Sequence, residues 1–213
     1  MGWKKKIAVG SGATVLAAVV FVVGGGLLIE PNFDISTETE LKASPEAAFR
    51  LVSSPAGVQA WWKDFHEELP EGQSSPPMEM PILEGPTEGP GSRIAFEADG
   101  HRWEEWKLLE LSPPGKVVWE VDFQIMVTNR TLELVDNGQG GTKMSWSDRG
   151  KIQNPIFRWM TVLMPPDDVV ANFQHAMKLL DKRALEQEAA SSAAPSGAPD
   201  QSFESERAED VPP

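Results

Sequence analysis

The chain has 213 residues, enough for one domain of ordinary size with extensions at its ends. With 19 basic and 32 acidic residues its formal charge is −13, and such a surface repels the phosphates on which non-specific nucleic-acid binding depends. Because the chain contains no cysteine, disulfides, thiolate catalysis and cysteine-ligated metal sites are excluded.

The first predicted element is a transmembrane helix over residues 7–29, a stretch without any charged side chain. As a helix this stretch would extend roughly 34 Å, enough to cross the ~30 Å hydrocarbon core of a bilayer. The basic N-terminus, residues 1–6, carries Lys4, Lys5 and Lys6, which favours a cytoplasmic N-terminus and an extracytoplasmic domain after residue 30. A cleaved signal peptide is the alternative, but its apolar core should have about 7–15 residues before a cleavage site with small residues. We therefore expect a single-pass signal anchor.

The other end of the chain, residues 188–213, is rich in Ala, Ser, Pro and Glu and has few large apolar residues. Such a segment cannot bury enough apolar surface to offset the entropy of ordering, so we expect a disordered acidic tail. A partner-binding peptide around Phe203 is the functional alternative for this tail. One folded domain is then expected between the two ends, over residues 30–187.

Within this domain, residues 33–41 alternate between apolar and polar side chains and predict a half-buried strand. Ser44, Pro45 and Glu46 form a typical helix start, and we expect short helices over 45–53 and 55–65. The proline-rich residues 69–91 predict a long loop with an edge strand near 78–83.

Five further strands and one long helix complete the predicted domain. The strands are expected over residues 92–99, 102–111, 116–123, 126–135 and 142–151, and the short turns between them predict an antiparallel meander. The helix begins at Pro165–Asp168 and carries an apolar stripe at helical spacing. The predicted fold class is α+β, with a curved antiparallel sheet wrapped around a long C-terminal helix and one transmembrane helix before it.

This order of elements resembles the START-like, helix-grip superfamily called SRPBCC, and most closely its bacterial polyketide cyclase/dehydrase and lipid-transport branch. The resemblance covers residues 33–186 and rests on residues 41–49, Trp61-Trp62, 89–94, 140–146, Gly150, 154–164 and the last helix. It implies a deep cavity between sheet and helix for lipids, sterols, polyketides or other apolar ligands. An N-terminal membrane segment also looks like a recurring arrangement in this branch.

The aromatic residues of the predicted strands and last helix are the expected cavity walls, because small-molecule pockets are mainly apolar with a few polar groups. These candidate ligand-binding residues are Phe96, Trp106, Trp119, Phe123, Trp146 and Phe173. The alternative for each is an ordinary core position, which is the commoner fate of an aromatic residue in phase on a strand.

Arg130 and Asp148 are two further candidate ligand-binding residues, because their phase places them on the buried face of adjacent predicted strands. A buried charge is costly unless it is paired. They are expected either to pair with each other or to orient a carboxylate or carbonyl of a ligand. The alternative is that both lie near strand ends, in water.

Catalytic and metal motifs are sparse in this sequence. Residues 101–105 contain His and Glu but lack the second His, four residues after the first, that the helical zinc motif requires. There is no G-x-S-x-G sequence, and no catalytic residue can be named. We also expect no metal and no cofactor.

The first hypothesis is a membrane-anchored binding domain for a hydrophobic small molecule or lipid. A polyketide cyclase/dehydratase-like enzyme using the same cavity is the alternative, and a protein-interaction or chaperone-related module is the second alternative.

Overall fold

The computed structural model describes residues 19–68, 77–163 and 166–193, which form one sheet and a set of helices. Ahead of the sheet, residues 19–28 form a helix. The labelled elements are β1 (Asn32–Leu41), α2 (Pro45–Val52), α3 (Pro55–Glu67), β2 (Arg93–Ala98), β3 (His101–Ser112), β4 (Lys116–Asp122), β5 (Val127–Asp136), β6 (Thr142–Lys151), α4 (Pro155–Leu163) and α5 (Pro166–Ala193).

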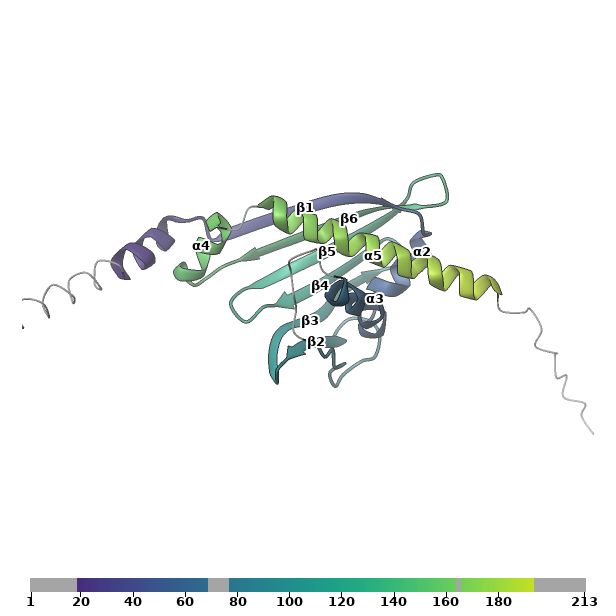
Figure 1. Ribbon diagram of the computed structural model, residues 1–213, viewed down its shortest axis with the longest axis horizontal. Coiled ribbons are helices and arrows are strands. Elements are labelled where there is room, and N and C mark those ends of the chain that lie inside the picture. The colour runs from purple at the N-terminus through teal and green to yellow at the C-terminus, as the bar shows by residue number, and fades with distance from the viewer. Residues whose placement is uncertain (1–18, 69–76, 164–165, 194–213) are drawn as a thin grey trace, which may run out of the picture.

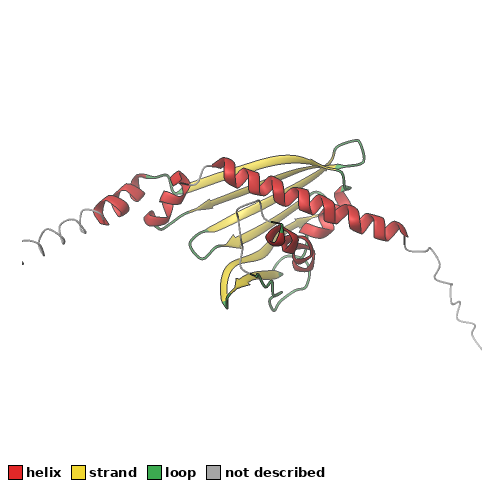
Figure 2. Cartoon of the chain, viewed as in Figure 1, coloured by secondary structure: helices red, strands yellow, loops and turns green. Residues whose placement is uncertain are grey.

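The six strands form a single antiparallel sheet in the order β1-β6-β5-β4-β3-β2. Neighbouring strands follow each other in sequence from β2 to β6, and β1 joins the far edge by pairing with β6. The sheet curves, and α5 crosses its concave face with α2 and α3 beside it (Figure 1; Figure 2). This arrangement is the helix-grip form of an α+β fold, and it confirms the expected curved sheet and C-terminal helix.

Polar side chains fix the helices that cover the sheet. Ser44 and Ser54 cap α2 and α3 by accepting hydrogen bonds from backbone N–H groups of the first helical turns, and a proline follows each cap. Asp181 of α5 accepts from the backbone N–H groups of Lys42 and Ala43 at 2.8 and 2.9 Å. This carboxylate therefore ties α5 to the turn between β1 and α2.

The core lies between the concave face of the sheet and the three covering helices, and tryptophan supplies much of its volume. Trp61 and Trp119 are fully buried, and each indole N–H reaches a backbone carbonyl at the end of α2. Trp61 Nε1 donates to Leu51 O at 3.1 Å, and Trp119 Nε1 donates to Val52 O at 2.9 Å. These bonds satisfy the polar edge of each ring, which is what a buried tryptophan needs.

The structure differs from the sequence expectations in three places. Helix α4 had no counterpart among the expected elements, and α5 continues through Ala193, six residues into the expected disordered tail. The supposed edge strand near 78–83 consists of two isolated bridges, Glu79 to Glu97 and Ile82 to Ile94. Residues 194–213 of the tail lie outside the described residues.

The expected transmembrane helix over residues 7–29 falls mainly outside the described residues, which begin at residue 19. Among the helices of the described residues, none is both long and apolar enough to span a bilayer.

Candidate functional site

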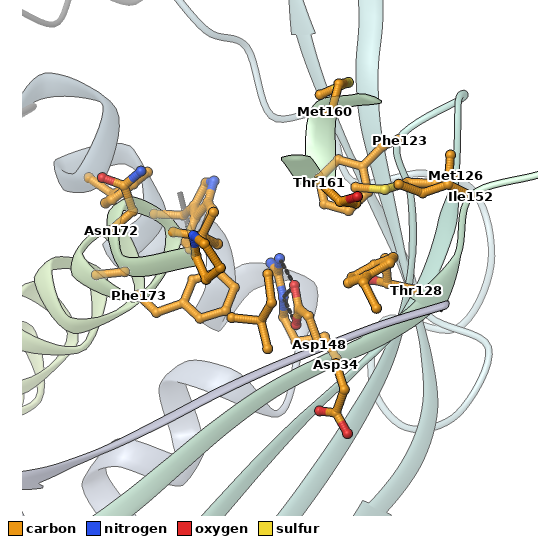
Figure 3. A pocket seen from close by; sticks show the side chains of 18 residues that line it. Asp34, Phe123, Met126, Thr128, Asp148, Ile152, Met160, Thr161, Asn172 and Phe173 are labelled. Atoms are coloured by element: carbon orange, nitrogen blue, oxygen red, sulfur yellow. Dashed lines mark hydrogen bonds and ion pairs between the residues drawn. The ribbon is translucent and has the colours of Figure 1, made fainter. Parts of the chain in front are cut away.

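A cavity of about 470 Å³ lies between the concave face of the sheet and the first turns of α5. This volume falls within the range of small-molecule sites, about 300–1,000 Å³. Figure 3 shows Phe123, Met126 and Met160 on one side of the cavity and Asn172 and Phe173 of α5 on the other. Most lining side chains are apolar: Phe33, Ile35, Trp62, Phe65, Phe123, Met126, Ile152, Met160, Pro166, Val169, Phe173 and Ala176. The polar lining residues are Asp34, Thr128, Arg130, Asp148, Thr161 and Asn172.

At the deep end of the cavity Arg130 and Asp148 form a buried ion pair. The two residues face each other directly across β5 and β6, and their exposed fractions are 3% and 4%. Arg130 donates from Nε to Oδ1 of Asp148 at 2.9 Å and from Nη2 to Oδ2 at 2.7 Å (Figure 3). Two parallel bonds of this kind combine energy with fixed geometry. The expected pairing is therefore confirmed, and the solvated alternative is wrong because both residues lie inside their strands.

Aromatic rings surround the Arg130 guanidinium. Its central carbon lies 4.4 Å from the ring centroid of Trp106 and 4.8 Å from that of Trp146. Trp146 also donates its indole N–H to Oδ1 of Asp148 at 3.1 Å. Contacts between a cation and aromatic rings at this range are attractive, the more so away from water. The rings and the carboxylate thus hold the guanidinium in one orientation.

Glu104 of β3 is a third charged group at this end, and it was not among the predicted site residues. Its Oε1 lies 3.7 Å from Arg130 Nη1 and accepts a hydrogen bond from the indole N–H of Trp106. Burial raises the pKa of Glu104 above its ordinary value, and the attraction of Arg130 only partly opposes this effect. Glu104 shares the period-two phase of Trp106 and Leu108, which was the available signal for it in the sequence.

The electrostatic balance keeps Arg130 charged. Burial alone opposes the charge, but the attraction and hydrogen bonds of Asp148, with the attraction of Glu104, outweigh burial and raise the pKa of Arg130. The guanidinium is therefore a permanent cation whose charge is already matched by carboxylates inside the fold.

Three buried polar side-chain atoms have no hydrogen-bond partner within the described part of the chain, and all three belong to residues that line the cavity. They are Trp62 Nε1, Thr128 Oγ1 and Arg130 Nη1. A buried donor without a partner costs about 1–3 kcal/mol. Two of the three are donors only and the third is a hydroxyl, so the buried wall around the cavity contains hydrogen-bond donors that no group of the described residues uses.

The eight predicted ligand-binding residues divide into two groups of four. Phe123, Arg130, Asp148 and Phe173 line the cavity. The other four, Phe96, Trp106, Trp119 and Trp146, are not among its lining residues and are fully or almost fully buried. Those four are ordinary core residues, as the alternative had it. The Trp62 ring of α3 packs on Phe96, Trp106 and Trp146 and covers this part of the concave face. Trp106 and Trp146 still touch the site through Arg130.

The cavity opens at the end of the sheet where β1 begins and β6 ends. The exposed lining residues Met160 and Thr161 of α4, which follows β6, belong to this end, whereas the buried lining residues Arg130, Asp148 and Ala176 lie deeper. Helix α4, which contributes Met160 and Thr161, thus forms one side of the mouth.

Two of the histidines, His66 and His175, pack against α3 or the residue that follows it. His66 lies at the end of α3 against Trp62 and Phe65, and burial lowers its pKa. His175 is partly buried, and its Nε2 lies 2.8 Å from Glu68 O. No cluster of His, Asp or Glu within the described residues could hold a metal ion.

Comparisons with known proteins point to the same fold. A family model described as "Polyketide cyclase / dehydrase and lipid transport" matches residues 32–185. No curated protein matches the chain in sequence.

Solved structures with this fold come from plants and bacteria. The ginseng major latex-like protein 151 from Panax ginseng is 12% identical, with a TM-score of 0.53, over 73% of this chain and 99% of that one. The truncated norcoclaurine synthase from Thalictrum flavum is 14% identical, with a TM-score of 0.52, over 73% and 94%. A protein from Thermus thermophilus is 19% identical, with a TM-score of 0.51, over 73% and 99%. At these identities the similarity concerns the fold alone.

Proposed function

Because the chain belongs to the polyketide cyclase/dehydrase and lipid transport family, we propose that it binds an apolar small molecule in the cavity beneath α5. The observation that carries this proposal is the combination of an apolar lining with unpartnered donors from Trp62 and Arg130 at buried positions within the described residues. An apolar lining favours ligands that leave water readily. The donors favour a ligand with an oxygen acceptor at one end.

The preferred acceptor is a neutral one, such as a ketone, ester or amide carbonyl. Asp148 already neutralises Arg130, and Glu104 places a further carboxyl 3.7 Å from Nη1. A ligand carboxylate would bring an additional negative charge into this buried group, at a cost in desolvation and repulsion. A carbonyl oxygen accepts from Arg130 Nη1 or Trp62 Nε1 without that cost.

Binding is favoured over catalysis by the state of the carboxylates in the cavity wall. Asp148 accepts hydrogen bonds from Arg130 and Trp146, and the carboxylate of Asp34 lies on the opposite face of the sheet, where it pairs with Arg149 at 2.8 Å. A general acid or base must have a free site within reach of the substrate. An enzyme of the cyclase/dehydratase type is the alternative, with Glu104 as its candidate acid or base, although Glu104 is not among the lining residues of the cavity.

We further propose that residues 7–29 anchor the chain in a membrane, with the domain on the extracytoplasmic side. The uncharged length of this segment and the lysines at 4–6 support the proposal. A reporter that is active only in the cytoplasm, fused after Pro213, should give no signal. An active reporter would contradict the proposed orientation.

Ligand binding is tested by photocrosslinking the full chain, reconstituted in lipid nanodiscs, with 4-butylbenzophenone. This probe is apolar and carries one carbonyl oxygen. Ala176 lines the cavity and is buried, whereas Ala171 on the same helix is exposed. Ala176→Leu should therefore abolish crosslinks to cavity residues such as Met126 and Phe173, and Ala171→Leu should leave them unchanged. Equal crosslinking in both variants, with thermal unfolding confirming that both are folded, would contradict the proposal.

A further inference from the structure

Two helices at the mouth of the cavity carry an apolar surface that the sheet does not cover. We call residues 19–28 and α4 (Pro155–Leu163) together the apolar platform. No side chain of α4 is buried. The large exposed apolar residues of the platform are Val19, Val20, Phe21, Val22, Leu27, Leu28, Ile156, Met160, Val162 and Leu163. An exposed apolar patch of this extent marks an interaction site.

The platform presents no free charge. Arg158 is its one charged residue. The Arg158 guanidinium is directed to the protein backbone, where it donates to Ile152 O at 3.0 Å, Gln153 O at 3.3 Å and Ile29 O at 3.4 Å. The charge thus joins the two helices to the end of the sheet and leaves the outer surface apolar.

Close packing makes the two helices a single unit. Trp159 of α4 donates its indole N–H to Val22 O at 2.8 Å, and its ring lies 5.9 Å from that of Phe21. Glycine permits the approach: a Cβ atom on Gly26 would overlap the carbonyl oxygen of Pro155, and one on Gly25 would lie 2.6 Å from the Trp159 ring. The two helices can therefore meet a partner only as one surface.

We propose that α4 of the apolar platform lies at the boundary between the headgroups and acyl chains of a lipid bilayer, which the helix at residues 19–28 enters. The sequence identifies this partner: the helix at residues 19–28 belongs to the uncharged stretch 7–29, which follows three lysines and has bilayer-spanning length. A second protein surface would have to supply an apolar match for that entire length. This step rests on the anchoring proposed above.

The contact between Trp159 and Val22 lies at a depth that suits the boundary between headgroups and acyl chains. Val22, which accepts the Trp159 bond, precedes Ile29 by seven residues, or about 10 Å along a helix. Interfacial helices bury their apolar faces roughly 5–10 Å into the headgroup and acyl boundary. Tryptophan is enriched at this level because its ring is apolar and its N–H is polar.

The consequence for the cavity is direct access from the membrane. Met160 and Thr161 belong to the platform and also line the mouth. With α4 in the bilayer surface, an apolar ligand passes between the acyl chains and the cavity without crossing bulk water. Such a passage avoids a cost of about 0.8 kcal/mol for each CH₂ group exposed to water.

The absence of cysteine makes the depth of single positions measurable. Val162 of α4 and Val135 of β5 are 59% and 61% exposed. Helix α4 follows the end of β6, whereas Val135 lies opposite Lys143 at the start of β6, so the two positions belong to opposite ends of this strand. Val162→Cys and Val135→Cys are each labelled with the fluorophore NBD, and the full chain is reconstituted in phosphatidylcholine vesicles. A fraction of the lipid then carries a nitroxide near the top of its acyl chain. The label at position 162 should shift to shorter wavelength and lose intensity with the nitroxide lipid, whereas the label at position 135 should do neither.

Two other results would overturn the proposal, and they can be told apart. A label at 162 that behaves like the one at 135 places α4 in water. A wavelength shift without nitroxide quenching identifies a second copy of the chain as the partner, which crosslinking of the vesicles would detect as a dimer. Resistance of the same chain to carbonate extraction reports on the anchor separately, so loss of anchoring and loss of α4 docking are distinguishable. Failure of ligand binding is read from the benzophenone experiment and not from this one.

Discussion

The Arg130–Asp148 pair offers the sharpest energetic prediction, because the same sheet contains an exposed pair for comparison. Asp148→Asn would leave the Arg130 charge buried beside a neutral amide, with only Glu104 as a charged neighbour at 3.7 Å among the described residues. Breaking a buried pair by removing one partner costs about 3–5 kcal/mol. For a domain of this size, a loss of that order lowers the midpoint of thermal unfolding by roughly 6–20 °C.

The comparison pair is Asp34 and Arg149, on β1 and β6, with side chains 57% and 69% exposed. Arg149 follows Asp148 in sequence and points to the opposite face of the sheet, so Arg149→Met perturbs the same strand at an exposed site. An exposed pair contributes about 0–1 kcal/mol. Thermal unfolding of the full chain in one detergent, followed by tryptophan fluorescence, measures both variants under matched conditions.

The double variant Arg130→Met with Asp148→Leu separates stability from recognition. Replacing both charges with apolar side chains of similar size should restore most of the stability that Asp148→Asn removes. It should still reduce benzophenone crosslinking, because the donor at the deep end of the cavity is gone. If Asp148→Asn destabilises no more than Arg149→Met, the assigned burial and cost of the inner pair are wrong.

Three further predictions follow from individual contacts. Burial raises the pKa of Glu104, so the folded state holds its proton more tightly than the unfolded state, and the stability of the native chain should fall as pH rises from below 4.5 through that raised pKa. Glu104→Gln should lose this pH dependence in thermal unfolding; an unchanged profile would contradict the raised pKa. Gly26→Ala should separate the helix at 19–28 from α4 and speed hydrogen exchange of the α4 amides, whereas Gly24→Ala, with open space at its Cβ position, should not. Trp62→Phe removes an unpartnered indole N–H and should weaken crosslinking without lowering stability by more than about 1–2 kcal/mol; undiminished crosslinking would exclude Trp62 as a ligand donor.

The sheet and the long helix could be predicted because their signals are local and periodic. Residues 33–41 and 116–123 alternate cleanly, and β1 and β4 follow these limits within one residue at each end. Ser44 with Pro45 and Pro165 with Pro166 similarly marked where α2 and α5 begin. In the two strands, the alternation of apolar and polar residues that predicts a strand also predicts which side chains face the core.

Helix α4 was not predicted because its burial gives no helical stripe. It contains Arg158 and Thr161 among apolar side chains, and none of its side chains is buried, so no stripe facing the core marks it as a helix of the domain. The extension of α5 to Ala193 was missed for a related reason. Composition predicted disorder after residue 187, but Glu188 accepts hydrogen bonds from Ser44 and holds this part of the helix to the domain.

The candidate site was predicted only in outline. The phase of Arg130 and Asp148 identified two inward charges, and the structure shows them paired. Phase could not separate the aromatic residues of the cavity wall from those of the core, because both point to the same face of the sheet. That distinction depends on where α3 places Trp62, which follows from packing between distant segments.

Native mass spectrometry of the full chain, released from detergent, tests whether the cavity holds a ligand. We expect the native chain and Ala171→Leu to carry an apolar small molecule with a carbonyl or similar acceptor, and Ala176→Leu to carry none. The bound molecule is identified by extraction and fragmentation. Equal occupancy of the native chain and Ala176→Leu, or a cavity that stays empty in all three proteins, would contradict ligand binding in this cavity.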